Sequence, residues 1–129
     1  MIKAVIIGFA HMHVNEVALY ISRHPEYSLE AAADMPSDLE KIEPLRYTPE
    51  WNKENIRTNF CPRIYEDYCQ MLDEVKPEVA FILTENFQKK KAAEACAVRG
   101  INIILEKPMA VNLKEARAIE ALAEKYGIE

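Results

Sequence analysis

The chain has 129 residues, the size of one domain, and it carries 16 Lys and Arg against 21 Asp and Glu, for a formal charge of −5. This acidic balance argues against binding nucleic acid or anionic lipid through phosphates, and the apolar runs are too short to span a membrane. The three cysteines are odd in number and widely spaced, which predicts reduced thiols and a cytoplasmic protein. We therefore expect one domain over residues 1–129, with neither nucleic acid nor membrane as a partner.

The first third of the chain predicts a strand, a tight turn, a helix and a second strand. The apolar run 3–7 is rich in β-branched residues and stops at Gly8, which is typical of a buried parallel strand. Apolar residues then recur at helical spacing between residues 14 and 21. A second apolar run, 29–33, closes on Asp34. These segments form a βαβ unit.

Residues 35–63 contain four prolines and show no sustained period. Ser37 and Glu40 have the spacing of a capping box, which predicts a short helix that stops before Pro44. The stretch 47–61 is interpreted as a long irregular connection.

Strands and helices alternate again in the second half of the chain. We expect strands at 63–65, 79–84 and 101–105, and helices at 68–75, at 88–99 and from 112 to 126. Gly100 and Gly127 follow two of these helices and are predicted to be left-handed caps. Lys89, Lys90 and Lys91 are interpreted as a solvated helical turn without a function. The element order predicts an α/β fold with a doubly wound, Rossmann-type parallel sheet between two helical layers.

The turn after the first strand is the first candidate site, because ligands of such sheets bind beyond the carboxyl ends of the strands. Residues 8–13 read Gly-Phe-Ala-His-Met-His where a dinucleotide-binding domain has G-x-G-x-x-G. Gly8 permits the tight turn and Ala10 is small, whereas His13 does not obviously suit close helix–strand packing. The following helix could bind a phosphate through its first amides, and a generic βα turn is the alternative.

Asp34 is the second candidate, because it ends the second strand about twenty residues beyond the turn. A carboxylate there can accept hydrogen bonds from both ribose hydroxyls of an adenosine. It would repel a 2′-phosphate, so the sequence favours NAD over NADP. A solvated or helix-capping aspartate is the alternative.

His11 and His13 raise the question of a metal ion. Positions i and i+2 do not share a helix face, and no cysteine or carboxylate nearby in the sequence completes a ligand set. We therefore expect no metal, and we expect the two imidazoles to line the turn or to contact phosphate.

Glu106, Lys107 and Pro108 follow the last predicted strand. A Glu–Lys pair at the end of a central strand is costly unless it is paired or used. Pro108 restricts Lys107 to an extended conformation, which would fix the direction of its side chain. Beside a nicotinamide, this lysine could bind a substrate oxygen or take part in proton transfer. A salt bridge at the strand end is the alternative.

In order and register, these segments resemble the N-terminal domain of the glucose–fructose oxidoreductase/inositol dehydrogenase (Gfo/Idh/MocA) family. The resemblance rests on the opening strand with Gly8, on Asp34, on the run 77–84, and on the run 100–110 with its Glu-Lys-Pro-Met-Ala string. It implies a Rossmann domain that binds NAD(P) and exchanges hydride with a hydroxyl carbon, often of a sugar or cyclitol. It also implies that Lys107 contacts cofactor and substrate and is important for catalysis.

The residues expected to bind the cofactor come from two sources, the positions that match the family and the interpretation of the two histidines. They are Gly8, Ala10, His11, His13, Asp34, Thr84, Asn86, Glu106, Lys107 and Pro108.

The chain also departs from the family pattern. Two motif glycines are replaced, Glu85 stands where the family usually has proline, and the family's histidine shortly after Asn86 is absent. The family continues into a second α/β domain that binds substrate, so we expect this chain to be a piece of a longer protein and inactive alone. The apolar surface that such a domain would cover predicts self-association as a homo-oligomer.

The main hypothesis is therefore the nucleotide-binding domain of an NAD-dependent oxidoreductase. Two alternatives stay open: a non-catalytic nucleotide-sensing or interaction module, and a Rossmann relative that binds coenzyme A or another nucleotide.

Overall fold

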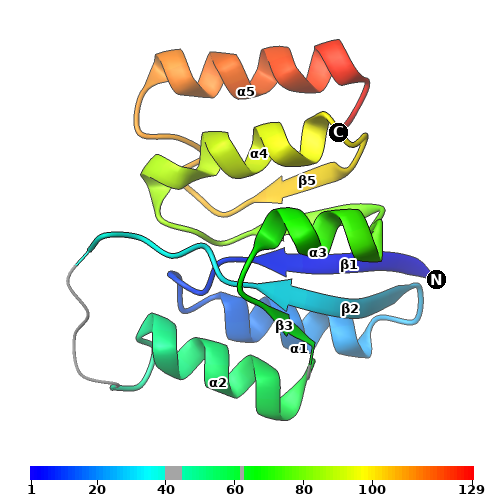
Figure 1. Ribbon diagram of the computed structural model, residues 1–129, viewed down its shortest axis with the longest axis vertical. Helices are drawn as coiled ribbons and strands as arrows, with labels where there is room; N and C mark the ends of the chain where they lie inside the picture. Colours follow the sequence, from blue (N-terminus) through cyan, green and yellow to red (C-terminus); the bar gives the residue numbers. More distant parts are fainter. Residues whose placement is uncertain (40–44, 62) are drawn as a thin grey trace.

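The computed structural model describes residues 1–39, 45–61 and 63–129, and it shows a parallel sheet with helices on both faces (Figure 1). The strands of these residues are β1 (Ile2–Ile7), β2 (Tyr27–Ala33), β3 (Ile64–Tyr65), β4 (Val79–Ile82) and β5 (Asn102–Leu105). Their order across the sheet is β3-β2-β1-β4-β5, and every neighbouring pair is parallel. This is the Rossmann order, which confirms the predicted fold class.

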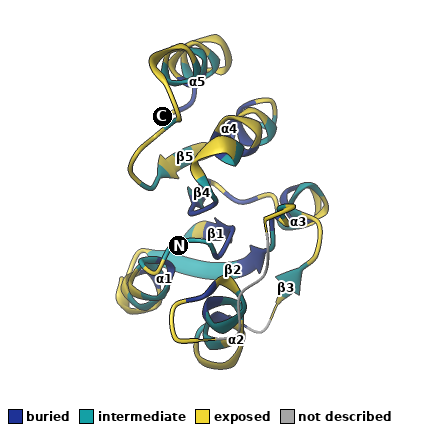
Figure 2. Ribbon diagram, turned by 90° about the vertical axis from the view of Figure 1, so that its left-hand side faces the viewer, coloured by how far each residue is buried: buried dark blue, intermediate teal, exposed yellow. Residues whose placement is uncertain are grey.

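Helices cover the two faces of the sheet as Figure 2 shows, looking onto the carboxyl ends of the strands. The helices are α1 (Val14–Arg23), α2 (Pro49–Asn59), α3 (Tyr68–Val75), α4 (Lys89–Ala97) and α5 (Leu113–Tyr126), with a 3₁₀ turn η1 at Asn86–Gln88. α1 and α2 pack on the face that Ile6 presents, α3 and α4 pack on the face of Ile7, and α5 packs against α4. Among the described residues, no helix is long and apolar enough to cross a membrane.

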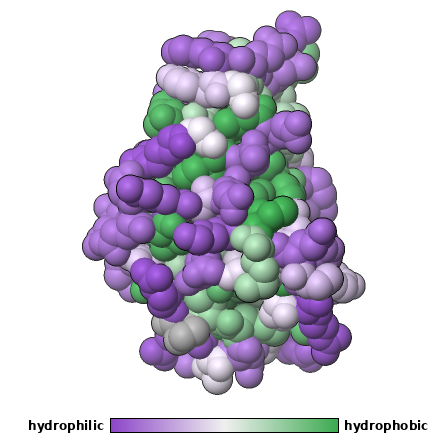
Figure 3. All heavy atoms as spheres, turned by 90° about the vertical axis from the view of Figure 1, so that its right-hand side faces the viewer, coloured by the Kyte–Doolittle hydropathy of each residue, from purple (hydrophilic) through white to green (hydrophobic). Residues whose placement is uncertain are grey.

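Residues 4–7 of the central strand β1 are buried between the two helical layers, and Ile6 and Ile7 are each 0% exposed. A strand covered on both faces needs apolar residues at every position, so its sequence loses the alternation of a half-exposed strand. The opposite edge of the sheet, where the strands begin, carries hydrophobic side chains interspersed with hydrophilic ones (Figure 3).

The largest departure from the sequence-based expectation is α2. The stretch 47–61 was expected to be irregular, but residues 49–59 form a helix. Thr48 caps the helix by accepting a hydrogen bond from the Trp51 amide, and Pro49 occupies the first turn, where its missing N–H costs nothing. α2 buries only Asn52 and Ile56, so it has no apolar stripe that a periodicity argument could detect.

The short helix expected from Ser37 is not present in the part of that segment the structure describes, because 37–39 are not helical. Its remaining residues, 40–44, including Glu40 and Pro44, lie outside the described residues. The two predicted caps are confirmed, with φ of +69° at Gly100 and +66° at Gly127.

Candidate functional site

The turn after β1 is built on a close approach between Gly8 and Thr84 at the end of β4. Gly8 has φ +86°, and a Cβ there would lie 2.5 Å from Thr84 Cγ2 and 2.8 Å from Thr84 Cα. The Gly8 amide donates to the Ala33 carbonyl at 2.9 Å, and the Ala10 amide donates to the Leu83 carbonyl at 3.2 Å. The turn is therefore tied to the ends of both neighbouring strands.

The tip of the turn presents donors suited to an anion. The amides of His11 and Met12 have no hydrogen-bond acceptor among the described residues. The carbonyls of the same two residues accept from the amides of Val14 and Asn15, which starts α1. Two free N–H groups at a helix N-terminus are what a phosphate requires.

Asp34 lies beside a cavity of about 500 Å³, a size suited to a small-molecule ligand. Its Oδ2 accepts from Lys53 Nζ at 3.0 Å, and its Oδ1 accepts from the Met35 amide at 2.9 Å. A carboxylate has about four lone-pair sites, so Asp34 can still accept ribose hydroxyls. The cavity is lined by Phe9, Ala10, Asp34, Met35, Pro36, Ser37, Leu39, Pro49, Glu50, Lys53, Glu66 and Glu85.

Lys53 is a site residue that the sequence pattern did not indicate. Its ammonium also donates to Glu66 Oε1, at 3.2 Å. Burial lowers the pKa of Lys53, but the hydrogen bonds and charges of Asp34 and Glu66 outweigh burial and hold the pKa above its ordinary value. Lys53 thus places a fixed positive charge beside Asp34.

Asn52 is a second such residue, and it connects α2 to the turn. Its side chain is 0% exposed, and its Nδ2 donates to the Phe9 carbonyl at 2.9 Å and to the Tyr47 carbonyl at 3.3 Å. Its Oδ1 accepts from Asn15 Nδ2 at 2.8 Å. α2 therefore fixes the conformation of the turn from outside the sheet.

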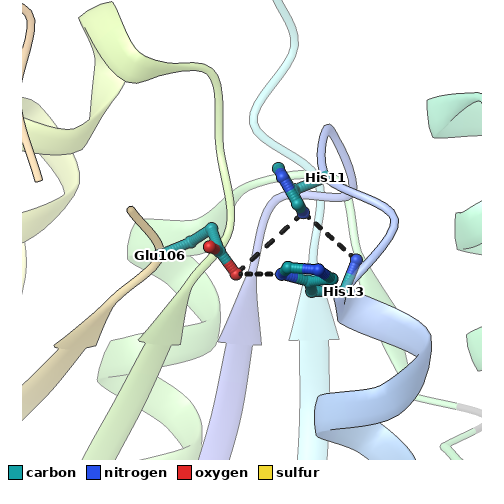
Figure 4. A group of neighbouring side chains, drawn as sticks. All are labelled: His11, His13 and Glu106. Carbon is teal, nitrogen blue, oxygen red and sulfur yellow. Dashed lines mark hydrogen bonds and ion pairs between the residues drawn. The ribbon is translucent and has the colours of Figure 1, made fainter. Parts of the chain in front are cut away.

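The two histidines of the turn meet a carboxylate from the end of β5 (Figure 4). His13 Nδ1 lies 2.9 Å from Glu106 Oε2, and His11 Nδ1 lies 4.0 Å from the same oxygen. The His13 amide donates to His11 Nδ1 at 3.2 Å. Glu106 is 93 residues from His13 in the chain, so sequence proximity could not reveal this group.

The charge states of this group follow from burial and contact. Burial lowers the pKa of His11, which favours the neutral imidazole. Burial raises the pKa of Glu106, but the hydrogen bond with His13 and the nearby imidazoles outweigh it and hold the pKa below its ordinary value. The cluster therefore joins an ionised carboxylate to two imidazoles.

Lys107 extends from the same strand end. Its side chain is exposed and has no hydrogen-bond or ion-pair partner in the described part of the chain, while Glu106 pairs with His13 instead. The peptide bond between Lys107 and Pro108 is cis. The positive charge of Lys107 is close enough to contribute to the lowered pKa of His11, after burial.

The prediction that Lys89, Lys90 and Lys91 form a solvated helical turn is wrong for Lys89. Lys90 and Lys91 are exposed as expected, but Lys89 is only 1% exposed. Its Nζ donates to Asn86 Oδ1 at 3.0 Å, to the Pro108 carbonyl at 2.6 Å and to the Glu106 carbonyl. The first helical turn faces the end of β5, so this ammonium is buried against backbone oxygens and holds the loop after β5.

The loop after β4 completes the edge. Thr84 is buried under Gly8, and Asn86 is exposed and bonded to Lys89. Glu85 Oε1 accepts from Ser37 Oγ at 3.1 Å, which joins this loop to the loop after β2. All residues predicted for the site thus lie along the carboxyl edge of the sheet, on four strand ends.

The comparisons with known proteins identify the family and support the fold. The model of the Gfo/Idh/MocA oxidoreductase family, described as an NAD-binding Rossmann fold, matches residues 2–128. Among curated proteins, mouse trans-1,2-dihydrobenzene-1,2-diol dehydrogenase is 29% identical over 119 residues, covering 92% of this chain and 33% of that protein. The chain thus spans about a third of the length of that curated relative.

Solved structures share the fold. Biliverdin reductase from Synechocystis, in complex with biliverdin and NADP⁺, has a TM-score of 0.77 at 17% identity, covering 98% of this chain and 36% of that one. An oxidoreductase from Agrobacterium radiobacter, in complex with NAD⁺, L-tartaric acid and magnesium, has a TM-score of 0.76 at 20% identity, covering 98% of this chain and 33% of that one. The family match spans the sheet, the turn and the Glu-Lys-Pro run, and this chain is therefore a member of the Gfo/Idh/MocA oxidoreductase family, matching its NAD-binding Rossmann domain.

Proposed function

We propose that this chain binds NAD across the carboxyl edge of its sheet and serves as the cofactor-binding part of a dehydrogenase acting on a hydroxyl carbon. The observation that carries the proposal is the turn, where Gly8 approaches Thr84 closely and the amides of His11 and Met12 have no acceptor among the described residues. These two amides would bind the pyrophosphate, and the cavity beside Asp34 would take the adenosine.

The choice of NAD over NADP rests on the charge of the cavity. Four carboxylates line it among the described residues, those of Asp34, Glu50, Glu66 and Glu85, against the single ammonium of Lys53. A 2′-phosphate would enter a negative environment, whereas ribose hydroxyls can donate to Asp34.

The nicotinamide end would lie toward the loops after β4 and β5. Bound NAD would supply the hydride acceptor for oxidation of an alcohol carbon. Lys107, whose side chain is exposed and has no partner in the described residues, would hold the substrate oxygen and assist proton transfer at its Nζ. Lys89 would position Lys107 by holding the carbonyls on both sides of it.

The substrate class is proposed from the relatives. The curated relatives bear the name of a dehydrogenase acting on a cyclic diol, and the structural neighbours include inositol dehydrogenases. A sugar, cyclitol or similar polyhydroxy compound fits this group. We further propose that residues outside these 129 determine which substrate is bound, because the relatives are about three times as long.

Calorimetric titration with NADH and NADPH tests the proposal. We expect NADH to bind and NADPH to bind more weakly. Asp34→Ala should weaken NADH binding by about 10- to 100-fold, since hydrogen bonds to a charged group contribute about 1.5–3 kcal/mol. Asp73→Ala, which removes an exposed carboxylate of α3 away from the cavity, is the matched control. Unchanged NADH affinity in Asp34→Ala, or equal binding of both dinucleotides, would contradict the NAD assignment.

A further inference from the structure

Two imidazoles and a carboxylate converge on one point above the sheet (Figure 4). One ligand atom from each of His11, His13 and Glu106 lies within 4.8 Å of the others. We propose that these three residues form a site for a divalent first-row transition-metal ion of the Zn²⁺ class, with further coordination positions open to solvent. This inference does not depend on the proposed cofactor.

The donor set fits such an ion. Two histidines and one carboxylate, with an open position, are a common ligand set for zinc and related ions. Ligand bonds of about 2.0–2.2 Å in a tetrahedral site place the donor atoms about 3.3–3.5 Å apart. The observed separations, 2.9 Å between His13 and Glu106 and 4.0 Å between His11 and Glu106, lie on either side of this value. Side-chain rotations that lengthen the first separation and shorten the second would bring both to this value.

The surrounding contacts hold the ligands in place. The turn that carries the histidines is tied to β2 and β4 through the amides of Gly8 and Ala10. The Lys107 amide donates to Glu106 Oε1 at 3.0 Å, which leaves Oε2 directed at the imidazoles. An oriented carboxylate of this kind is typical of metal sites. On binding the ion through Nδ1, His11 would give up the hydrogen bond from the His13 amide.

Solvent access also suits a metal ion. The side chains of His11 and His13 are 30% and 40% exposed, so an ion can enter and water can complete its shell. The positive charges nearby are those of Lys107 and Lys89, and the Lys89 ammonium is already bonded to oxygens.

The test is equilibrium binding of Zn²⁺ alone, measured on the full chain by competition with a chromophoric chelator. We expect one ion per chain. Loss of an outer-shell partner already costs about 10- to 100-fold in affinity, so His11→Asn, His13→Asn and Glu106→Gln should each weaken binding at least about tenfold. His24→Asn is the matched control, because His24 is the third histidine of the sequence and follows the far end of α1.

Co²⁺ provides a second readout through its visible spectrum, which distinguishes imidazole and carboxylate ligands from thiolates. We expect d–d bands without thiolate charge transfer, and we expect Cys69→Ser to leave them unchanged. Three results would overturn the proposed site. They are no Zn²⁺ binding by the wild type, wild-type Zn²⁺ affinity in all three ligand variants, or a thiolate charge-transfer band that is lost in Cys69→Ser. NADH titrations performed with a chelator present keep the test of the cofactor separate.

Discussion

Gly8 shows how a single residue can decide whether the site exists. Its backbone is left-handed, and the space where a side chain would begin is filled by Thr84. The place of Gly8 after an apolar strand predicted its role in a tight βα turn, because glycine adopts the positive φ that such a turn needs. It could not predict that Thr84 is the neighbour that excludes a Cβ, since that contact depends on how β1 and β4 pair.

Gly8→Ala should lower the free energy of unfolding by at least about 2 kcal/mol, because it adds a clash to the cost of a left-handed alanine. Gly100→Ala is the control, since Gly100 also has positive φ, but a Cβ added there would meet no atom within 4 Å among the described residues, apart from its chain neighbours. It should lose only about 1–2 kcal/mol. Urea denaturation measures both values, and equal losses would contradict the tight approach to Thr84.

Lys89 shows the limit of reading charge from sequence. Three consecutive lysines at a helix start resemble a solvated surface, yet the fold turns the first of them toward backbone carbonyls of a distant loop. Nothing local distinguishes Lys89 from Lys90. Lys89 differs from Lys90 only because the fold places α4 beside β5 and the loop that follows it.

Lys89→Met should destabilise the chain by about 1–3 kcal/mol, because it leaves the carbonyls of Glu106 and Pro108 without their donor. Lys90→Met, at an exposed position of the same helix, should change stability by no more than about 0.5 kcal/mol. Thermal or urea unfolding of the two variants measures the difference. If Lys89→Met is as stable as Lys90→Met, the buried ammonium does not hold this loop.

At the scale of elements, the pattern of apolar residues predicted the strands and helices whose buried positions are apolar. Residues 4–7 of β1 and the whole of β4 appear as continuous apolar runs, and α5 appears as an apolar stripe with a cap at Asn112. α2 was missed because it has only two buried positions, and one of them is the polar Asn52. Its helical start was nonetheless encoded in Thr48 and Pro49, a cap and a first-turn proline that the pattern search did not use.

The contribution of α2 to the site can be measured through Asn52. Asn52→Ala should lower stability by about 1–3 kcal/mol, because the buried carbonyl of Phe9 and the less buried carbonyl of Tyr47 lose their donor. It should also weaken NADH binding, since Phe9 belongs to the turn. Asn59→Ala, at an exposed position of α2, should change stability by about 0.5 kcal/mol at most and leave NADH affinity unchanged. If both variants behave alike, α2 does not support the turn.

At the scale of the whole molecule, the parallel sheet places the candidate site residues from four strand ends along one edge. The topological rule for such sheets predicted that Gly8, Asp34, Thr84 and Glu106 would lie together, and they do. The rule does not specify side-chain pairs. The contact of Glu106 with His13 and that of Asp34 with Lys53 depend on helix and loop positions that the sequence pattern did not determine.

The most direct test of the central claim is NADH titration of the isotope-labelled chain, followed residue by residue through backbone amide chemical shifts. The account predicts that the largest changes fall on 8–13, 34–37, 84–86 and 106–107, the loops at the carboxyl edge of the sheet. No change at saturating NADH, or largest changes at the opposite edge near Glu26 and Glu78, would contradict a dinucleotide site at this edge.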